Sequence, residues 1–261
     1  MSRAVNVDLH LAATRHQQIL TELAARGQVS AMGLAERLGV THETIRKDLV
    51  VLQERGLLRR VHGGAVPVES LAHEAPVAAR TAYGPEKLRI AEAARAFLPD
   101  EGAVLLDSGT TTLALAQLLP PSEQLMAITN SLPIATTLLP RVGGLTIIGG
   151  RVRRETEASV DQWALRSLEA VRVDVAFLGT NAFSLDHGLA TPDEAEAAVK
   201  SAFVGGARLR VLLTDHSKFG RESVFRYATL HDIDVLVTDT GLSADDARAI
   251  TDAAGVEVVR A

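Results

Sequence analysis

Residues 39–65 read GVTHETIRKDLVVLQERGLLRRVHGGA, and seven of these side chains can carry a positive charge. Thr41 can cap a helix here, because its side-chain oxygen can accept a free N–H of the first turn. The apolar residues of that helix recur at helical spacing: Ile45, Leu49 and Leu52. Gly56 is suited to end the helix. The residues after Gly56 then read strand, Gly-Gly turn, strand, which predicts a β-hairpin.

Two further helices are predicted upstream. The first covers residues 14–26, where the apolar residues recur at helical spacing and Gly27 follows: Ile19, Leu20, Leu23 and Ala24. Ser30 can cap a second, short helix whose inward residues are Leu34, Ala35 and Leu38. The pattern is a helix-turn-helix followed by a hairpin, which is the arrangement of a winged helix.

A second helix braced in this way can enter the major groove of DNA. On a helical wheel the residues opposite the apolar stripe are Glu43, Thr44 and Lys47, and Arg46 lies on its flank. Such side chains can contact phosphates or base edges. The candidate DNA-binding residues on the helix and the hairpin are Thr41, His42, Thr44, Arg46, Lys47, Arg59, Arg60 and His62. The alternative is an ordinary three-helix subdomain with a solvated basic face.

Composition bounds the rest of the chain. It has 261 residues, 47% of them hydrophobic, and it has no cysteine, so disulfides and thiolate metal sites are excluded. The N-terminal region lacks the apolar run of a signal peptide, and no stretch approaches ~20 apolar residues. We therefore expect a cytoplasmic protein, with a winged helix-turn-helix domain over residues 1–66, a linker over 67–84 and a second domain over 85–261.

The net charge of −5 conceals an asymmetry. Residues 1–66 hold 9 basic and 6 acidic side chains, a net +3, whereas the remainder holds 18 basic and 26 acidic side chains, a net −8. A local basic excess on an acidic protein favours binding of a polyanion, although a segment of +3 is also common on an ordinary solvated surface.

Strands and helices alternate in the larger part of the chain. Six buried-strand patterns are separated by helical stretches: AVLLD, LMAIT, LTIIGG, VDVAFLG, LRVLLTD and DVLVTD. This alternation predicts an α/β domain with a mostly parallel sheet and helices on both faces. Ligands bind such sheets beyond the carboxyl ends of the strands. Polar clusters follow the strands there, and DSGTTT at 107–112 can cradle a phosphate with free N–H groups and hydroxyls. The simpler interpretation is that Ser and Thr merely cap a helix.

The segment THETIRKDLVVLQERGLLRRVHGGA resembles the signature of the DeoR family of bacterial transcriptional repressors. Further resemblance comes from EKLRIAEAA, LLDSGTTT, TNS, IIGG, VDVAFLGTN, GLATPD and TDHSKFG, so it covers residues 14 to about 240. Two departures are visible. Lys47 replaces a usual arginine, and Thr41 with His42 replaces a more frequent opening. Lysine cannot form the bidentate hydrogen bonds that arginine makes to guanine or phosphate. The operator sequence is therefore the property that the resemblance to the family predicts least well.

The resemblance implies a sensor domain similar to ribose-5-phosphate isomerase that binds a phosphorylated sugar. The residues implied to bind this effector are Asp107, Ser108, Gly109, Thr110, Thr111, Thr112, Asn130, Gly179, Asn181, Thr191, Lys200, Asp215 and Lys218. The stretch 179–200 is most similar to the subgroup associated with fructose metabolism, so fructose 1-phosphate is the first candidate. We also expect a homodimer or homotetramer, which would set two winged helices at half-site spacing on operator DNA.

An enzyme is the alternative from another class. Asp107, Asp193, Glu194 and Asp215 are candidate carboxylates for a sugar-phosphate isomerase, but nothing in the sequence pairs them for acid-base chemistry. The eight histidines show no metal-ligand spacing, so we expect no metal site, no cofactor and no catalytic residue. The single tryptophan, Trp163, lies on an expected helix, and we place it in the core rather than at a subunit contact.

Overall fold

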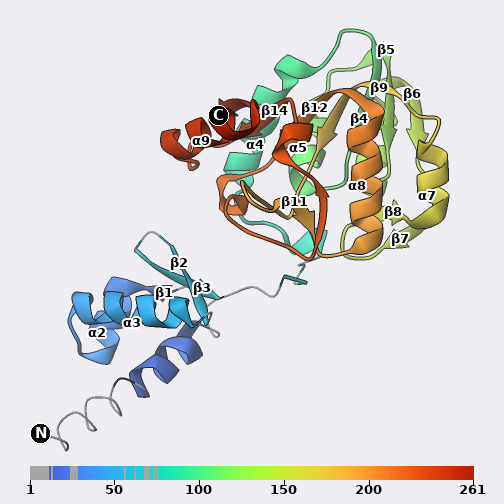
Figure 1. The fold of residues 1–261 in the computed structure, drawn as a ribbon. Helices are drawn as coiled ribbons and strands as arrows, with labels where there is room; N and C mark the ends of the chain where they lie inside the picture. The colour runs from blue at the N-terminus through green and yellow to red at the C-terminus, as the bar shows by residue number, and fades with distance from the viewer. Residues whose placement is uncertain are drawn as a thin grey trace, which may run out of the picture. The chain divides into compact units, whose positions relative to one another are not determined.

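The computed structural model of the chain describes residues 12, 14–23, 29–55, 57–61, 63–67, 71, 72, 74 and 76–261. The chain divides into two compact units, Met1–Ser70 and Leu71–Ala261, shown in Figure 1. Four residues named above lie outside the described part of the chain: Ala24, Gly27, Gly56 and His62.

The smaller unit is a winged helix. Residues 14–23 are helical, and α2 (Ala31–Leu38) and α3 (His42–Glu54) follow. The hairpin strands β2 (Leu58–Val61) and β3 (Gly64–Pro67) pair antiparallel. A short strand that the sequence did not reveal, β1 (Val29–Ser30), pairs with β3, so the sheet order is β1-β3-β2.

Local sequence signals place these helices. Ser30 accepts a hydrogen bond from Gly33 N at 3.0 Å, and Thr41 accepts one from Thr44 N at 3.1 Å, so both predicted N-caps are confirmed. Gly39 ends α2 in the left-handed conformation at φ 64°. The buried residues of the three helices and the hairpin form one apolar cluster: Ile19, Leu23, Leu34, Ile45, Leu49, Leu52, Leu58 and Ala65 among them.

The larger unit is built on a seven-stranded sheet in which every pairing is parallel. Its strands lie in the order β15-β14-β12-β9-β4-β5-β6. Their bounds are β4 Gly102–Leu106, β5 Ser122–Thr129, β6 Val142–Ile147, β9 Val173–Leu178, β12 Ala207–Leu213, β14 Val235–Thr238 and β15 Glu257–Arg260. The sequence indicated all of these strands except β15.

Helices cover both faces of the sheet. One apolar cluster joins one face to α4 (Gly84–Ala94), α5 (Thr110–Leu118) and α6 (Leu132–Leu138). A second cluster joins the other face to α7 (Asp161–Leu168), α8 (Glu194–Gly206) and α9 (Ala244–Ala254). Leu105 faces the second cluster, whereas its neighbours Val104 and Leu106 face the first, as the period of two in a strand requires. The predicted α/β fold with a parallel sheet is confirmed.

Smaller elements complete this unit. Strands β10 (Ala182–Ser184), β11 (Gly188–Thr191) and β13 (Phe225–Ala228) form an antiparallel sheet, and β7 (Arg151–Arg153) pairs with β8 (Ala158–Val160). Short 3₁₀ turns lie at η1 (Val77–Ala79), η2 (Arg95–Phe97), η3 (His216–Lys218) and η4 (Leu230–Asp232).

Trp163 lies on α7 but is 79% exposed, so its expected place in the core is wrong. The residues of α7 that pack inward are Ala164 and Leu168. Ala164 and Leu168 are four positions apart, so they share the inward face of this amphipathic helix, and Trp163 lies on its outer side.

Candidate functional site

The outer surface of α3 carries most of the side chains that the sequence assigned to DNA. Thr41, His42, Arg46 and Lys47 are exposed. Thr44 is half-buried, and its hydroxyl lies 2.8 Å from that of Thr41. The two threonines therefore fix the first turn of the helix, while the cationic side chains remain free to reach a duplex.

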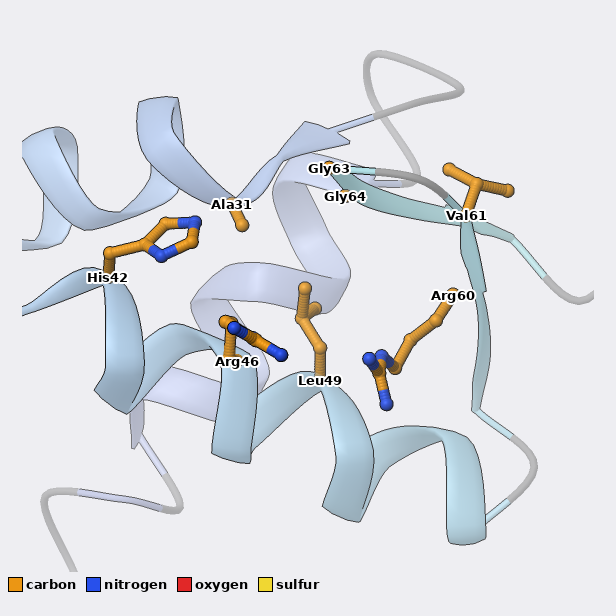
Figure 2. Close-up of a pocket in the computed structure, with 8 residues that line it drawn as sticks. All are labelled: Ala31, His42, Arg46, Leu49, Arg60, Val61, Gly63 and Gly64. Carbon is orange, nitrogen blue, oxygen red and sulfur yellow. The ribbon is translucent and has the colours of Figure 1, made fainter.

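A hollow lies between α3 and the hairpin. Figure 2 shows that Arg46 reaches it from the helix and Arg60 from β2. The other residues that line it are Ala31, His42, Leu49, Val61, Gly63 and Gly64. The helix and the wing thus present one guanidinium each to a shared hollow, and guanidinium groups can form bidentate hydrogen bonds with a phosphate.

A second groove lies along the outer side of α3. It is lined by Glu43, Arg46, Lys47, Val50, Val51, Glu54 and Arg60. The carboxylate of Glu43 stands in the first turn of the helix, where a recognition helix contacts base edges. The sequence-based list of DNA residues omitted Glu43, although its position opposite the apolar stripe could have indicated it. Arg59 is half-buried in β2, and His62 lies outside the described residues.

Asp48 anchors α3 from behind. Its carboxylate accepts hydrogen bonds from Arg15 at 2.5 and 2.9 Å and lies 3.0 Å from Nε2 of His16. Asp48 is buried, so this cluster ties the helix over residues 14–23 to the side of α3 that faces away from the grooves.

The larger unit places its polar residues at a topological switch point. The chain runs outward from β4 to β6, then returns to β9 on the other side of β4. In such sheets the crevice for a ligand opens beyond the carboxyl ends of the two strands at the reversal. Residues 107–112 follow β4, and Gly179 with Asn181 follow β9. Asn130 follows β5 and Asp215 follows β12, so four adjacent strands bring the predicted effector residues to one rim.

The loop 107–112 opens helix α5. Gly109 is its N-cap residue, with φ 151°, and no side chain caps the first turn. The capping interpretation of Ser and Thr is therefore wrong, since the hydroxyl of Thr112 donates to the carbonyl of Gly109 instead. The uncapped N–H groups and the positive end of the helix dipole suit an anion.

Asp107 holds this loop in place. It is fully buried, and its carboxylate accepts hydrogen bonds from the N–H groups of Ser108 and Gly179 at 2.8 and 3.0 Å. Lys200 Nζ lies 2.5 Å from Asp107 Oδ2 and donates to the Gly179 carbonyl at 3.1 Å. Tyr227, which the sequence did not indicate, donates to the same carbonyl at 2.9 Å.

Two carboxylates, those of Asp107 and Glu196, keep the buried Lys200 protonated. Burial lowers the pKa of Lys200, but the carboxylates of Asp107 and Glu196 outweigh it and raise that pKa above its usual value. Burial also raises the pKa of the Tyr227 hydroxyl. Lys200 is therefore a permanent buried cation that supports the loop, and Tyr227 stays a hydrogen-bond donor.

Three of the predicted effector residues have a buried oxygen without a hydrogen-bond partner. These atoms are Ser108 Oγ, Asn130 Oδ1 and Thr191 Oγ1. Buried polar groups are nearly always paired, so unpaired ones mark a place where a ligand or water completes the hydrogen bonding. Asn130 is otherwise held by its amide, which donates to the Ser159 carbonyl at 3.0 Å.

The remaining predicted residues take different positions. Asn181 donates to the Glu74 carboxylate at 3.1 Å. Asp215 caps η3 by accepting from Ser217 N at 3.1 Å, and Lys218 ends the same turn. Within the described part of the chain no group of His, Asp and Glu side chains is arranged to hold a metal ion. No helix among the described residues has the length and apolar character to cross a bilayer.

Two family models match the chain. One, described as a DeoR-like helix-turn-helix domain, matches residues 15–71, and the other, described as a DeoR C-terminal sensor domain, matches residues 84–240. Together they cover both units.

Curated relatives match over nearly their full length. HTH-type transcriptional regulator GlpR of Haloferax volcanii is 38% identical over 95% of this chain and 98% of its own. The uncharacterized HTH-type transcriptional regulator FruR of Bacillus subtilis is 32% identical over 86% and 90%, and the glycerol-3-phosphate regulon repressor of Haemophilus influenzae is 31% identical over 86% and 88%. These relatives are regulators, which sets aside the isomerase alternative.

Two solved structures show more distant similarity to the chain. Ribose 5-phosphate isomerase A of Methanocaldococcus jannaschii is 17% identical, with a TM-score of 0.37 over 51% of this chain and 53% of that protein. The full-length sorbitol operon regulator SorC of Klebsiella pneumoniae is 10% identical, with a TM-score of 0.40 over 90% and 97%.

Proposed function

This chain belongs to the DeoR family of DNA-binding transcriptional regulators, and from that premise we propose that it represses a sugar-catabolism operon and leaves its operator when the larger unit binds a phosphorylated sugar. One observation carries the proposal. The uncapped N-terminus of α5 lies at the switch point of the sheet, beside buried hydroxyl and amide oxygens that lack partners. Such a place suits a ligand with both a phosphate and hydroxyl groups.

Fructose 1-phosphate is our first candidate for the effector. The segment GTNAFSLDHGLATPDEAEAAVK over 179–200 supports it by its similarity to the fructose-metabolism subgroup. The relative named for a glycerol-3-phosphate regulon supports the wider class of phosphorylated polyols. A thermal-shift screen of sugar phosphates ranks these ligands, because a ligand that binds only the folded state raises the melting temperature with its concentration.

We further propose that the regulator acts in the cytoplasm as a homodimer or homotetramer. Two winged helices then lie at half-site spacing, about one turn of DNA or a multiple of it apart. The effector releases the operator only if it binds more tightly to the form that fits DNA poorly. A gel shift with the promoter of its own operon tests operator binding.

Two variants test the division of labour between the units. Lys47→Ala removes an exposed cation of α3, so it weakens operator binding and leaves sugar-phosphate binding unchanged. Thr110→Ala changes the start of α5, so it weakens sugar-phosphate binding and yields a repressor that does not respond to inducer. Gel shift and titration calorimetry are run on both variants. Equal loss of both activities in either variant contradicts the proposal.

A further inference from the structure

A chain of buried ion pairs begins at the loop that holds the proposed effector. Lys200 Nζ lies 2.5 Å from Asp107 Oδ2 and 3.5 Å from Glu196 Oε1. Arg153 donates to Glu196 through one guanidinium nitrogen and to Glu74 through the other, the latter at 2.8 Å. All five side chains are at most 9% exposed, so the chain Asp107–Lys200–Glu196–Arg153–Glu74 runs through the interior.

The far end of this chain lies in the strap, which we define as residues 71, 72, 74 and 76–83. Glu74 also binds Arg80 at 2.6 Å and Asn181 at 3.1 Å. The backbone N–H of Val77 donates to Glu155 O at 2.6 Å, two residues after Arg153. The strap directly follows Ser70, where the smaller unit ends, so it is the covalent connection between sensor and DNA-binding unit.

The alternation of charge makes each link depend on the next. Burial raises the pKa of Glu74, but the hydrogen bond from Arg153 and the charge of Arg80 outweigh it and lower that pKa below its usual value. Burial raises the pKa of Glu196, and the carboxylates of Glu74 and Asp107 add to this, against the opposing charges of Lys200 and Arg153. Removal of one partner from a buried pair leaves an uncompensated charge, so a change at one end disturbs its neighbours in turn.

We propose that this ion-pair chain transmits the state of the effector loop to the strap and so couples sugar-phosphate binding to release of DNA. The inference rests on the proposed function for the identity of its trigger. When the ligand draws the loop 107–112 toward itself, Lys200 loses part of its pairing with Asp107. Glu196 and Arg153 then re-pair, and Arg153 loosens its hold on Glu74. Arg153 and Glu74 are thus positioning residues that contact neither ligand.

The first experiment needs no effector. Amide hydrogen exchange at Val77, Ala79, Arg80 and Thr81 reports on the strap, because these N–H groups are hydrogen-bonded there. Arg153→Met removes the partner of Glu74 near the strap, and Asp107→Asn changes the opposite end of the chain. Both variants speed this exchange about tenfold or more, which corresponds to ~1.4 kcal/mol. Arg154→Met is the matched control, since Arg154 is exposed and adjacent, and it leaves the exchange unchanged.

The outcomes of this first experiment are distinct. Glu74→Gln keeps the shape of the side chain and should speed the exchange as Arg153→Met does. It therefore replaces Arg153→Met in this test if that variant folds poorly. Circular dichroism identifies a variant that has lost its fold. A folded Asp107→Asn protein with wild-type exchange in the strap overturns the proposal, because the two ends are then not connected.

The second experiment measures coupling. Operator affinity is determined with and without saturating fructose 1-phosphate, or whichever sugar phosphate of the thermal-shift screen binds the wild type. Arg153→Met binds operator and sugar phosphate within about threefold of wild type, but the ratio of operator affinities without and with the sugar phosphate falls toward one. Arg154→Met keeps the wild-type ratio. A wild-type ratio in Arg153→Met overturns the proposal. If no sugar phosphate binds the wild type, the proposed function fails, and the exchange experiment still decides the coupling.

Discussion

At the scale of single residues, the groove along the outer side of α3 contains two carboxylates, Glu43 and Glu54, beside its cations. Glu43 stands in the first turn of α3, and Lys47 lines the same groove. A carboxylate repels phosphates wherever it lies, but it accepts a hydrogen bond from the amino group of cytosine. Glu43 therefore fits a role in base selection better than a role in affinity.

Replacement of that carboxylate tests its role. Glu43→Gln should raise affinity for random duplex DNA, because one repulsive charge is gone, and should reduce the preference for operator about tenfold, since a good base contact is worth ~1–3 kcal/mol. Fluorescence anisotropy with operator and scrambled duplexes measures both. Glu54→Gln, at the other end of the same groove, is the control. An unchanged ratio of operator to random affinity would remove Glu43 from sequence recognition.

Asp239 sets a second prediction at this scale. Burial raises its pKa, but hydrogen bonds from His216 N, Gly241 N and His216 Nδ1 outweigh it and lower the pKa below the usual 3.8. A carboxylate with a lowered pKa stabilises the folded protein at pH values above its usual pKa. This stabilisation is lost as the pH falls through the lowered pKa.

The free energy of unfolding of the larger unit should therefore decline on acidification, and Asp239→Asn should make it depend less on pH between about 5 and 3. Urea unfolding across this range gives the measurement. Asp252→Asn, exposed on α9, is the matched control and should leave the pH dependence as in the wild type. Identical pH profiles for wild type and Asp239→Asn would contradict the assignment.

At the scale of elements, the wing depends on a close backbone contact. A Cβ atom on Gly64 would lie 2.0 Å from the carbonyl oxygen of Val29, which is the partner strand's backbone. Gly64 is therefore required for β3 to approach β1. The same pairing fixes the hairpin that carries Arg60 into the hollow beside Arg46.

Gly64→Ala should separate β1 from β3, destabilise the smaller unit by about 2 kcal/mol and weaken operator binding. Chemical unfolding and gel shift measure the two effects. Gly205→Ala in α8 serves as the control, because nothing lies within 4 Å of its added Cβ, and it should leave both quantities near wild type. Full operator binding by Gly64→Ala would show that the wing tolerates a displaced β3.

At the scale of the whole molecule, the apolar residues gather into separate clusters. One cluster belongs to the smaller unit, and two others pack on the two faces of the parallel sheet. Cooperative unfolding follows a shared core, so units with separate cores melt as separate transitions.

Calorimetry should therefore resolve two transitions. A bound sugar phosphate should raise only the transition of the larger unit, and an operator duplex should raise the transition of the smaller one. Thr110→Ala is the control for the first shift and Lys47→Ala for the second. A single transition that moves as a whole with either ligand would contradict this separation.

Local signals made much of the fold predictable. The caps at Ser30 and Thr41 depend on residues three positions apart. Strand β4 is recognisable from its own short apolar run, without knowledge of the strands that it pairs with. The strap and its ion pairs could not be foreseen, because Glu74 and Arg153 are 79 positions apart and meet only in the folded chain. The short edge strand β15 lacks the continuous apolar run of a central strand, since two of its four residues are exposed.

The candidate site was predictable to the same degree. The polar loops after β4, β5, β9 and β12 were identified from their positions after apolar runs, and the parallel sheet brings them to one rim. Which of these side chains are engaged by other protein groups depends on tertiary contacts: Lys200 pairs with Asp107, and Asn181 pairs with Glu74. The domain boundaries, the DNA-binding list and the effector list stay predictions.

The exposed position of Trp163 has a practical consequence. The chain contains one tryptophan, so its fluorescence emission reports a single place, the outer side of α7. In water the indole emits at long wavelength. Association of copies through α7 would shield the ring and move the emission to shorter wavelength as the protein concentration rises, whereas assembly through any other surface would leave the spectrum unchanged. The intrinsic fluorescence of the unmodified protein therefore reports whether copies associate through α7 or through another surface.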